Sequence, residues 1–195
     1  MSWRTAPLTM ALIAINIILY GVDAFTNHAL AQKYEMLPSA VQHGEWWRFV
    51  TYGFMHGSWT HVLINMYALL QAGAFVEYCY GTPRYAIIYA FGLVGGGIAA
   101  YLTTISSDVP TVGASGAILG VFGAMVILAF KLPRLRSELL RAGILPILLT
   151  LGYGLFNPNV SNWGHIGGLL LGGLAAVLLT PVRGRELAPI DQDES

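Results

Sequence analysis

Residues 111–120 read TVGASGAILG, and in this segment Ser115 lies between glycines at the head of a long apolar run. A run of this kind predicts a membrane helix. Gly116, Gly120 and Ala124 recur every four residues, and small residues at this spacing let a second helix backbone approach closely. The hydroxyl group of Ser115 then needs partners from neighbouring helices, because polar groups inside a bilayer are costly when they are left alone.

The composition places the whole chain in a membrane. Of the 195 residues, 55% are hydrophobic and only 10% are charged, whereas a soluble domain carries about 25% charged residues. The formal net charge is zero and no basic run occurs, which argues against nucleic acid as a partner. Cys79 is the only cysteine, so the chain has no intrachain disulfide. We therefore expect an all-α integral membrane protein.

Six apolar runs are long enough, or nearly long enough, to cross a bilayer. They cover residues 7–25, 59–79, 83–104, 114–130, 141–157 and 164–181. The fourth and fifth are short, and residues 131–141 between them read as a connector. We expect one six-helix domain over residues 1–181, with a long first loop at 26–58, and a disordered tail over 182–195.

The distribution of basic residues predicts the orientation of this domain. Most of the basic residues fall in the termini and in the second and fourth connections, whereas the other side holds only Lys33 and Arg48. The positive-inside rule then places both termini in the cytoplasm. Short tails without a targeting signal favour a prokaryotic plasma (inner) membrane. The long first loop lies outside, and its aromatic residues are either an interfacial belt or part of a folded segment: Trp46, Trp47, Tyr52, Phe54 and Trp59.

Three spans carry polar side chains at their predicted outer ends. The second carries His56, His61 and Asn65, the fourth begins at Ser115, and the sixth begins close to His165. Helix packing would explain each residue alone. Their agreement in depth favours a shared site, because intramembrane polar groups usually face a cavity or one another.

Glycine spacing offers a way to bring two of these spans together. Gly164, Gly168 and Gly172 form a stripe on the sixth span, like the stripe that contains Gly116 and Gly120 on the fourth. If the two stripes face each other, the serine and the histidine lie at the same end of one close crossing.

These groups predict acyl-transfer chemistry. Serine becomes a good nucleophile when a base removes its proton, and His165 is the candidate base. His61, Asn65 and the backbone N–H of Ser115 are candidate donors to a tetrahedral oxyanion. No acid lies near them in the outer half, so a dyad is favoured over a triad. The chain has no HExxH motif, and we expect no metal or cofactor.

The ordered motifs resemble the rhomboid intramembrane serine proteases over nearly the whole chain. They are WWR at 46–48, HGSWTHVLIN at 56–65, GASG at 113–116 and GHIGG at 164–168. The resemblance implies a six-helix fold, transmembrane protein substrates taken from the lipid bilayer, Ser115 as nucleophile and His165 as base. It implies oxyanion donors at His61 and Asn65, with Gly113 near the same site. It gives supporting roles to a further group of residues: His56, Trp47, Arg48, Glu77 and Gly168.

One position departs from the family pattern. Some members place a tyrosine four residues after the serine, stacked on the histidine, and here that position is Leu119. The alternative within the same fold is a non-catalytic protein that binds membrane helices, and the intact serine and histidine favour the enzyme. A small transporter would show an internal repeat, and none is visible. Residues 157–162, NPNVSN, form a turn-rich segment that is a candidate lid over the site.

Overall fold

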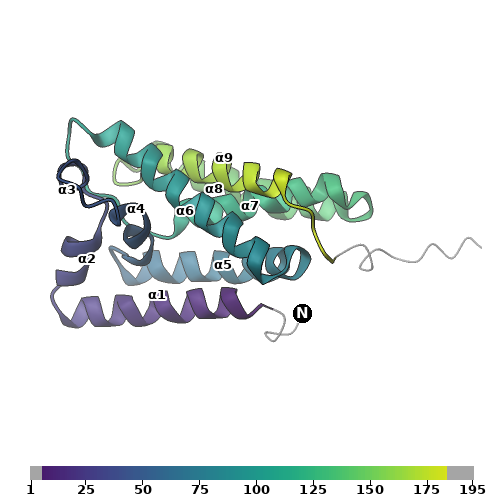
Figure 1. The fold of residues 1–195 in the computed structure, drawn as a ribbon, viewed down its shortest axis with the longest axis horizontal. Helices are drawn as coiled ribbons and strands as arrows, with labels where there is room; N and C mark the ends of the chain where they lie inside the picture. Colours follow the sequence, from purple (N-terminus) through teal and green to yellow (C-terminus); the bar gives the residue numbers. More distant parts are fainter. Residues whose placement is uncertain (1–5, 184–195) are drawn as a thin grey trace, which may run out of the picture.

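A computed structural model of the chain describes residues 6–183. In this part of the chain the long helices run side by side as a bundle (Figure 1). They are α1 (Pro7–Phe25), α5 (Trp59–Tyr80), α6 (Thr82–Thr104), α7 (Ser115–Lys131), α8 (Arg136–Phe156) and α9 (Asn162–Leu178). Residues 26–58 gather at one end of the bundle, here called the loop end. The opposite end is called the Glu77 end.

The bundle is that of an integral membrane protein. Four segments are long and apolar enough to cross a membrane: α1, α5, α6 and Pro133–Phe156, which includes α8. The helices α7 and α9 are apolar but have only 17 residues each. The expectation of an all-α membrane bundle is confirmed. The count of six complete crossings stays a prediction.

The fifth predicted span was placed too late in the chain and was wrongly expected to be short. The connector is reduced to Leu132 and the 3-10 turn η3 (Pro133–Leu135), and α8 begins at Arg136. Arg136 and Glu138 belong to the first turns of this helix, because arginine, glutamate and leucine are all good helix formers. Charge marks where an apolar run ends, and a helix can continue beyond that point.

The helix α7 lies at the centre of the bundle and packs against α5, α6, α8 and α9. A β-carbon at Gly168 of α9 would collide with the backbone carbonyl of Gly116, and one at Gly172 would collide with Gly120. The two glycine stripes therefore face each other, which meets the condition for Ser115 and His165 to lie at the same end of one crossing. A third helix shares this contact, because a β-carbon at Gly92 of α6 would lie 3.1 Å from the carbonyl oxygen of Ala117.

The first loop is a folded segment rather than a plain aromatic belt. It contains α2 (Ala29–Tyr34), α3 (Pro38–Gln42), α4 (Arg48–Thr51) and the 3-10 turn η2 (Tyr52–Phe54). Met36 and Thr111 form an isolated antiparallel bridge, which ties this loop to the strand-like approach to α7. Trp46 and Trp47 are exposed, whereas Tyr52 is only 2% exposed and therefore belongs to the folded segment rather than to an aromatic belt.

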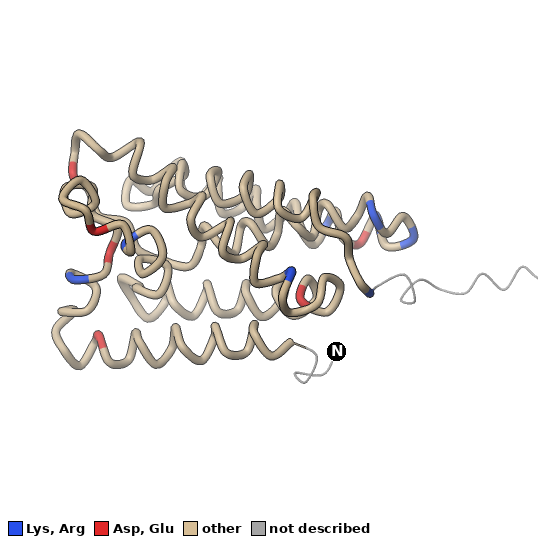
Figure 2. Tube along the Cα trace, in the orientation of Figure 1, with Lys and Arg blue, Asp and Glu red and all other residues tan. Residues whose placement is uncertain are grey.

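The charged residues divide between the two ends, as Figure 2 shows. Within residues 6–183, most acidic side chains lie at the loop end and most basic ones at the Glu77 end. The backbone N–H groups of Val182 and Arg183 donate to the carbonyl of Cys79, which holds the start of the predicted tail against the bundle. The rest of that tail, 184–195, lies outside the described residues.

Candidate active site

The side chains of Ser115 and His165 are in direct contact. The hydroxyl Oγ of Ser115 lies 2.8 Å from Nε2 of His165. Ser115 is the first residue of α7, and His165 lies in the first turn of α9. Because the glycine stripes let the two helices cross closely, their first turns bring these two side chains within hydrogen-bond distance. His165 is only 7% exposed.

Two serines fix the helix starts that carry the histidines of the site. Ser161 caps α9, since its Oγ accepts a hydrogen bond from the N–H of Gly164. Ser58 caps α5 in the same way, and its Oγ accepts from the N–H of His61. An N-cap serine satisfies an N–H group that has no partner inside the helix. Each cap therefore fixes the first residue of its helix and, with it, the position from which the histidine side chain projects.

His61 and Asn65 point at the residue that leads into α7. A β-carbon at Gly113 would lie 2.8 Å from Nε2 of His61 and 3.9 Å from Nδ2 of Asn65. The φ angle of Gly113 is +121°, a conformation that L side chains rarely adopt. Only glycine therefore fits between the helix start and the two side chains.

The amide of Gly113 already has a partner. Its N–H donates to the carbonyl of Tyr52 at 3.0 Å, and the hydroxyl of Tyr52 donates to the carbonyl of Leu93 on α6 at 2.7 Å. Tyr52 thus connects the first loop to both α6 and the approach to α7. Gly113 leaves room for other donors but does not offer its own N–H to a ligand.

Several polar atoms around the dyad are buried without a partner in the part of the chain that the structure describes. They include Nδ2 of Asn65 and Nδ1 of His165. Buried polar groups normally have hydrogen-bond partners, so each exception calls for an explanation. No carboxylate bonds to His165 among residues 6–183, so the contact has two members, as a dyad does. The described residues also contain no cluster of metal-ligating side chains.

The predicted supporting residues divide into two groups. His56 precedes α5, and its ring lies 5.0 Å from that of His61 in an edge-on arrangement. Burial, and then the neighbouring His61, lower the pKa of His56 to about 3, which keeps the imidazole neutral. Arg48 donates to Glu45 and to the carbonyl of Glu35, both at 2.6 Å, and so braces the first loop. Trp47 is 52% exposed and lies outside the site.

Glu77 and Leu119 are buried, and both lie within helices rather than in loops. Glu77 is near the end of α5, at the end of the bundle away from the dyad, where its carboxylate accepts hydrogen bonds from the start of α1. Leu119, at the position where some relatives place tyrosine, is 1% exposed and belongs to the apolar core. Gly168 lies one turn after His165 and provides the close approach to Gly116.

The candidate lid at 157–162 is a turn held by its own hydrogen bonds. The N–H of Val160 donates to the carbonyl of Asn157, and Nδ2 of Asn157 donates to the hydroxyl of Tyr153. Asn162 donates from Nδ2 to the carbonyl of Leu151 on α8. The segment is therefore attached to α8 as well as to α9.

Comparison with known families identifies the family to which the chain belongs. A family model described as the Rhomboid domain matches residues 43–182, which include the first-loop motif, the serine and the histidine. The chain belongs to the rhomboid family. Its resemblance to that family, drawn from the sequence motifs alone, is thereby confirmed.

Individual rhomboid relatives cover different parts of the chain. It is similar to Rhomboid protease GluP of Bacillus subtilis, with 37% identity over 142 residues that make up 72% of this chain and 27% of that protein. It is 35% identical to RHOMBOID-like protein 5 of Arabidopsis thaliana over 135 residues, 68% of this chain and 43% of that protein. Rhomboid protease GlpG of Photorhabdus laumondii is 26% identical over 181 residues, 91% of this chain and 63% of that protein. The chain spans less than half the length of the first two relatives.

Sequence reasoning missed several residues that hold this rhomboid site in place. The caps Ser58 and Ser161 had a readable signal, because serine before an apolar run often begins a helix. The glycine run at 95–97 of α6 was visible too, and a β-carbon at Gly96 would lie 3.0 Å from the carbonyl of Gly164. Tyr52 had no such signal, because its role depends on backbone partners far away in the chain.

Proposed function

We propose that this chain is an intramembrane serine endopeptidase that cleaves membrane-anchored proteins in or near their transmembrane segments. The observation that carries the proposal is the 2.8 Å contact between Oγ of Ser115 and Nε2 of His165 inside a bundle of apolar helices. Membership of the rhomboid family supports it, and so do relatives named as rhomboid proteases. The alternative within the same fold is a non-catalytic protein that binds membrane helices.

In the proposed mechanism Ser115 is the nucleophile and His165 is both base and acid. With its ring hydrogen on Nδ1, His165 accepts the hydroxyl proton of Ser115 at Nε2 while Oγ attacks the carbonyl carbon of the scissile bond. The tetrahedral intermediate collapses as His165 returns the proton to the leaving amine. Water then attacks the acyl-serine with the same proton transfers, which releases the acid product and restores both side chains.

The negative charge of the tetrahedral intermediate needs fixed donors. We assign this role to Nδ2 of Asn65, to Nε2 of His61 when that nitrogen carries the hydrogen, and to the backbone N–H of Ser115. Two observations support the assignment: Nδ2 of Asn65 is buried without a partner, and both side chains face Gly113, two positions before the serine. The N–H groups of the first turn of α7 have no partners within the helix and add a positive field.

We further propose that the loop end of the bundle faces the outer side of a prokaryotic plasma membrane. The excess of basic side chains at the Glu77 end supports this orientation through the positive-inside rule. Both termini are then cytoplasmic, and the dyad opens toward the outer side, where water for hydrolysis is available. The substrates are transmembrane proteins that reach the site from the surrounding bilayer.

Labelling with a fluorophosphonate probe tests the proposal directly, because such probes react with activated serines. The purified protein should be labelled, and Ser115→Ala should remove all labelling. Ser106→Ala is the matched control, since this serine lies after the end of α6 and takes no part in the site. Equal labelling of the Ser115→Ala variant, or no labelling and no cleavage of any transmembrane substrate by the parent, would overturn the enzyme assignment in favour of the binding protein.

A further inference from the structure

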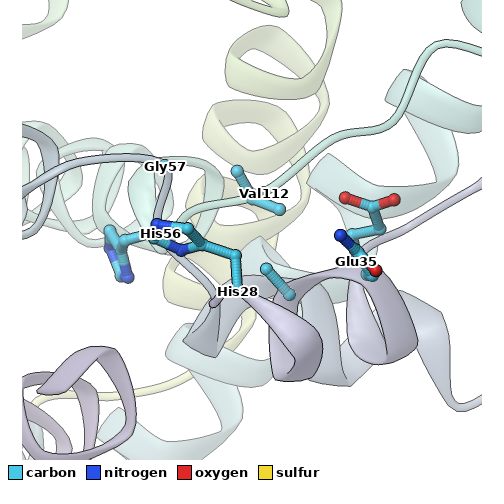
Figure 3. A pocket seen from close by; sticks show the side chains of 7 residues that line it. His28, Glu35, His56, Gly57 and Val112 are labelled. Carbon is cyan, nitrogen blue, oxygen red and sulfur yellow. The ribbon is translucent and has the colours of Figure 1, made fainter. Parts of the chain in front are cut away.

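A separate cavity of about 210 Å³ opens at the loop end. It is lined by α2, by the end of the first loop and by the residue before Gly113: His28, Ala31, Gln32, Glu35, His56, Gly57 and Val112. A water molecule takes up about 30 Å³ of liquid volume, so the cavity has room for the head of a side chain. Figure 3 shows the carboxylate of Glu35 at one side and the rings of His28 and His56 at the other.

The wall of this cavity carries the carboxylate of Glu35, whose charge the nearby Arg48 offsets only in part. The carboxylate of Glu35 makes no hydrogen bond or ion pair within residues 6–183, and its partly buried position raises its pKa, although Arg48 offsets part of that shift. The guanidinium of Arg48 is itself directed to Glu45 and to the backbone carbonyl of Glu35. A partly buried carboxylate that has no hydrogen bond or ion pair of its own favours a further cation beside it.

The two histidines of the cavity do not supply that cation. His56 is neutral, because burial keeps its pKa near 3. Nδ1 of His28 lies 3.0 Å from Oδ2 of the buried Asp23, so a positive charge on this ring would be balanced by Asp23. The local charge is therefore set by Glu35, within a loop end that is already rich in acidic residues. Both features attract a positively charged group.

The cavity also lies close to the nucleophile along the chain. Val112 lines it and is three residues before Ser115, so at most about 11 Å of extended chain separates the two positions. On the other wall, Glu35 directly precedes Met36, which pairs with Thr111. An extended peptide with its scissile bond at Ser115 would place a side chain three to five residues away at the mouth of the cavity.

We propose that this cavity binds the ammonium or guanidinium group of a lysine or arginine in the outer flank of the substrate, with Glu35 as the residue that selects for positive charge. The inference rests on the proposed protease function and narrows its substrate class. Lysine and arginine are enriched on the cytoplasmic flanks of membrane proteins. A basic residue on the outer flank is therefore a distinctive feature, which makes it an effective mark for choosing a substrate.

The test is a charge exchange between enzyme and substrate in a neutral, lipid-free detergent. A transmembrane substrate is prepared with lysine, glutamine or glutamate at one position at a time, three, four or five residues from the cleaved bond on its outer flank. The enzymes are the parent, Glu35→Gln and Glu35→Lys. Glu138→Gln is the matched control, because this substitution makes the same chemical change on α8, far from the cavity. The measured quantity is the ratio of kcat/KM between the lysine and glutamine substrates.

The parent should prefer lysine over glutamine by about tenfold at one flanking position, as expected for a hydrogen bond to a charged group. Glu35→Gln should bring this ratio to about one, Glu35→Lys should favour the glutamate substrate, and Glu138→Gln should keep the parental ratio. A purely structural role for Glu35 would not produce the reversal. A parental ratio of one at every position, or an unchanged ratio in Glu35→Gln, overturns the proposal.

Fluorophosphonate labelling of the parent separates the possible failures. If Ser115 is labelled and cleavage shows no charge preference, the cation site is wrong and the protease stands. If neither labelling nor cleavage occurs, the protease assignment itself fails. The cation could also come from the amine head group of a lipid. Added ethanolamine lipid that raises cleavage of every substrate equally in the parent, but not in Glu35→Gln, would overturn the assignment to a substrate side chain.

Discussion

At the Glu77 end of the bundle, a buried carboxylate is surrounded by donors. Glu77 accepts hydrogen bonds from the N–H groups of Leu8 and Thr9 and from the hydroxyls of Thr9 and Thr82, at 2.8–3.0 Å. At the loop end, Nδ2 of Asn65 and Nδ1 of His165 are equally buried and have no partner among residues 6–183. The chain thus satisfies a buried carboxylate at one end and leaves buried nitrogens of the candidate site open at the other.

The difference separates two uses of polarity in a membrane protein. Bonds to Glu77 join the starts of α1 and α6 to the end of α5, so they contribute to holding the helices together. Unmet donors at the loop end cost free energy in the resting protein, and they are available to a ligand that brings an acceptor. Variants at the loop end should therefore lose activity, whereas variants at the Glu77 end should lose stability.

The largest expected effect is at the dyad. Ser115→Ala and His165→Ala should each lower turnover of a transmembrane substrate by about 10³-fold or more, because nucleophile and base act as one unit. The double variant should be no slower than the slower single variant. Thermal unfolding in detergent should stay close to that of the parent. Additive losses in the double variant would contradict a shared step.

The next largest effect is at the unmet donors. Asn65→Ala and His61→Ala should each lower kcat by about 10²–10³-fold, the loss seen when one oxyanion donor is removed. Asn65→Ala should not lower the unfolding temperature, because its Nδ2 has no partner to lose. Gln71→Ala on the same helix is the control. If Asn65→Ala is as unstable as a Glu77 variant, the contrast between the two ends does not hold.

The third effect is on stability rather than on chemistry. Glu77→Ala should lower the free energy of unfolding by about 3 kcal/mol, because it leaves several buried donors without an acceptor. Glu138→Ala removes the same charge from the first turns of α8 and should change the free energy of unfolding little. Denaturation of both variants in one detergent gives the comparison. Equal stability of the two would show that the bonds to Glu77 do not hold the bundle.

A smaller loss is expected at the end of α9. Nζ of Lys131 donates to the carbonyls of Ala176, Val177 and Leu179, the last turn of α9 and the residue after it. A cation there satisfies carbonyls that lack helical partners and interacts well with the helix dipole. Lys131→Met should lower the free energy of unfolding by about 1.5 kcal/mol. The exposed Lys33→Met is the control, and equal losses would contradict the capping role.

The smallest effect concerns pH and Glu35. Burial raises the pKa of this carboxyl in the folded protein, so its contribution to stability is full below its unfolded pKa and is lost as pH rises through the folded one. Glu35→Gln should therefore match the parent at acidic pH and unfold at a slightly higher temperature at neutral pH. Thermal scans across that range give the measurement. A variant that is less stable than the parent at neutral pH would show that the carboxylate has a partner.

Much of the site was predictable because its signals are local. The order of the apolar runs predicted the helices, and the glycine spacing showed which faces of the fourth and sixth spans could meet closely. Ser115 and His165 followed from that crossing together with the rhomboid resemblance. The first turns of α8 were missed, because charge hides the start of a helix that continues past the apolar run.

Other features were not predictable, because they depend on contacts between distant segments. The carbonyl of Tyr52 accepts a hydrogen bond from the amide of Gly113, and no sequence pattern around either residue predicts that bond. The cavity beside Glu35 is lined by segments far apart in the chain, and the bridge between Met36 and Thr111, 75 positions later, directly adjoins the lining residues Glu35 and Val112. Where no local sequence pattern predicts the partner of a residue, the contact can be identified only from the folded structure.

The sequence alone was enough to predict a bundle of membrane helices and to show which faces of two helices carry small residues. It also predicted Ser115 and His165 as the reacting groups of the proposed enzyme. Hydropathy and small-residue spacing act through neighbours within a few turns, so they can be read along the chain. Three features depend on the packing of all the helices: the 2.8 Å distance between Oγ of Ser115 and Nε2 of His165, the unpaired Nδ2 of Asn65, and the cavity beside Glu35. Hydrogen bonding and burial depend on positions to within tenths of an ångström, and only the packing of all the helices together sets those positions.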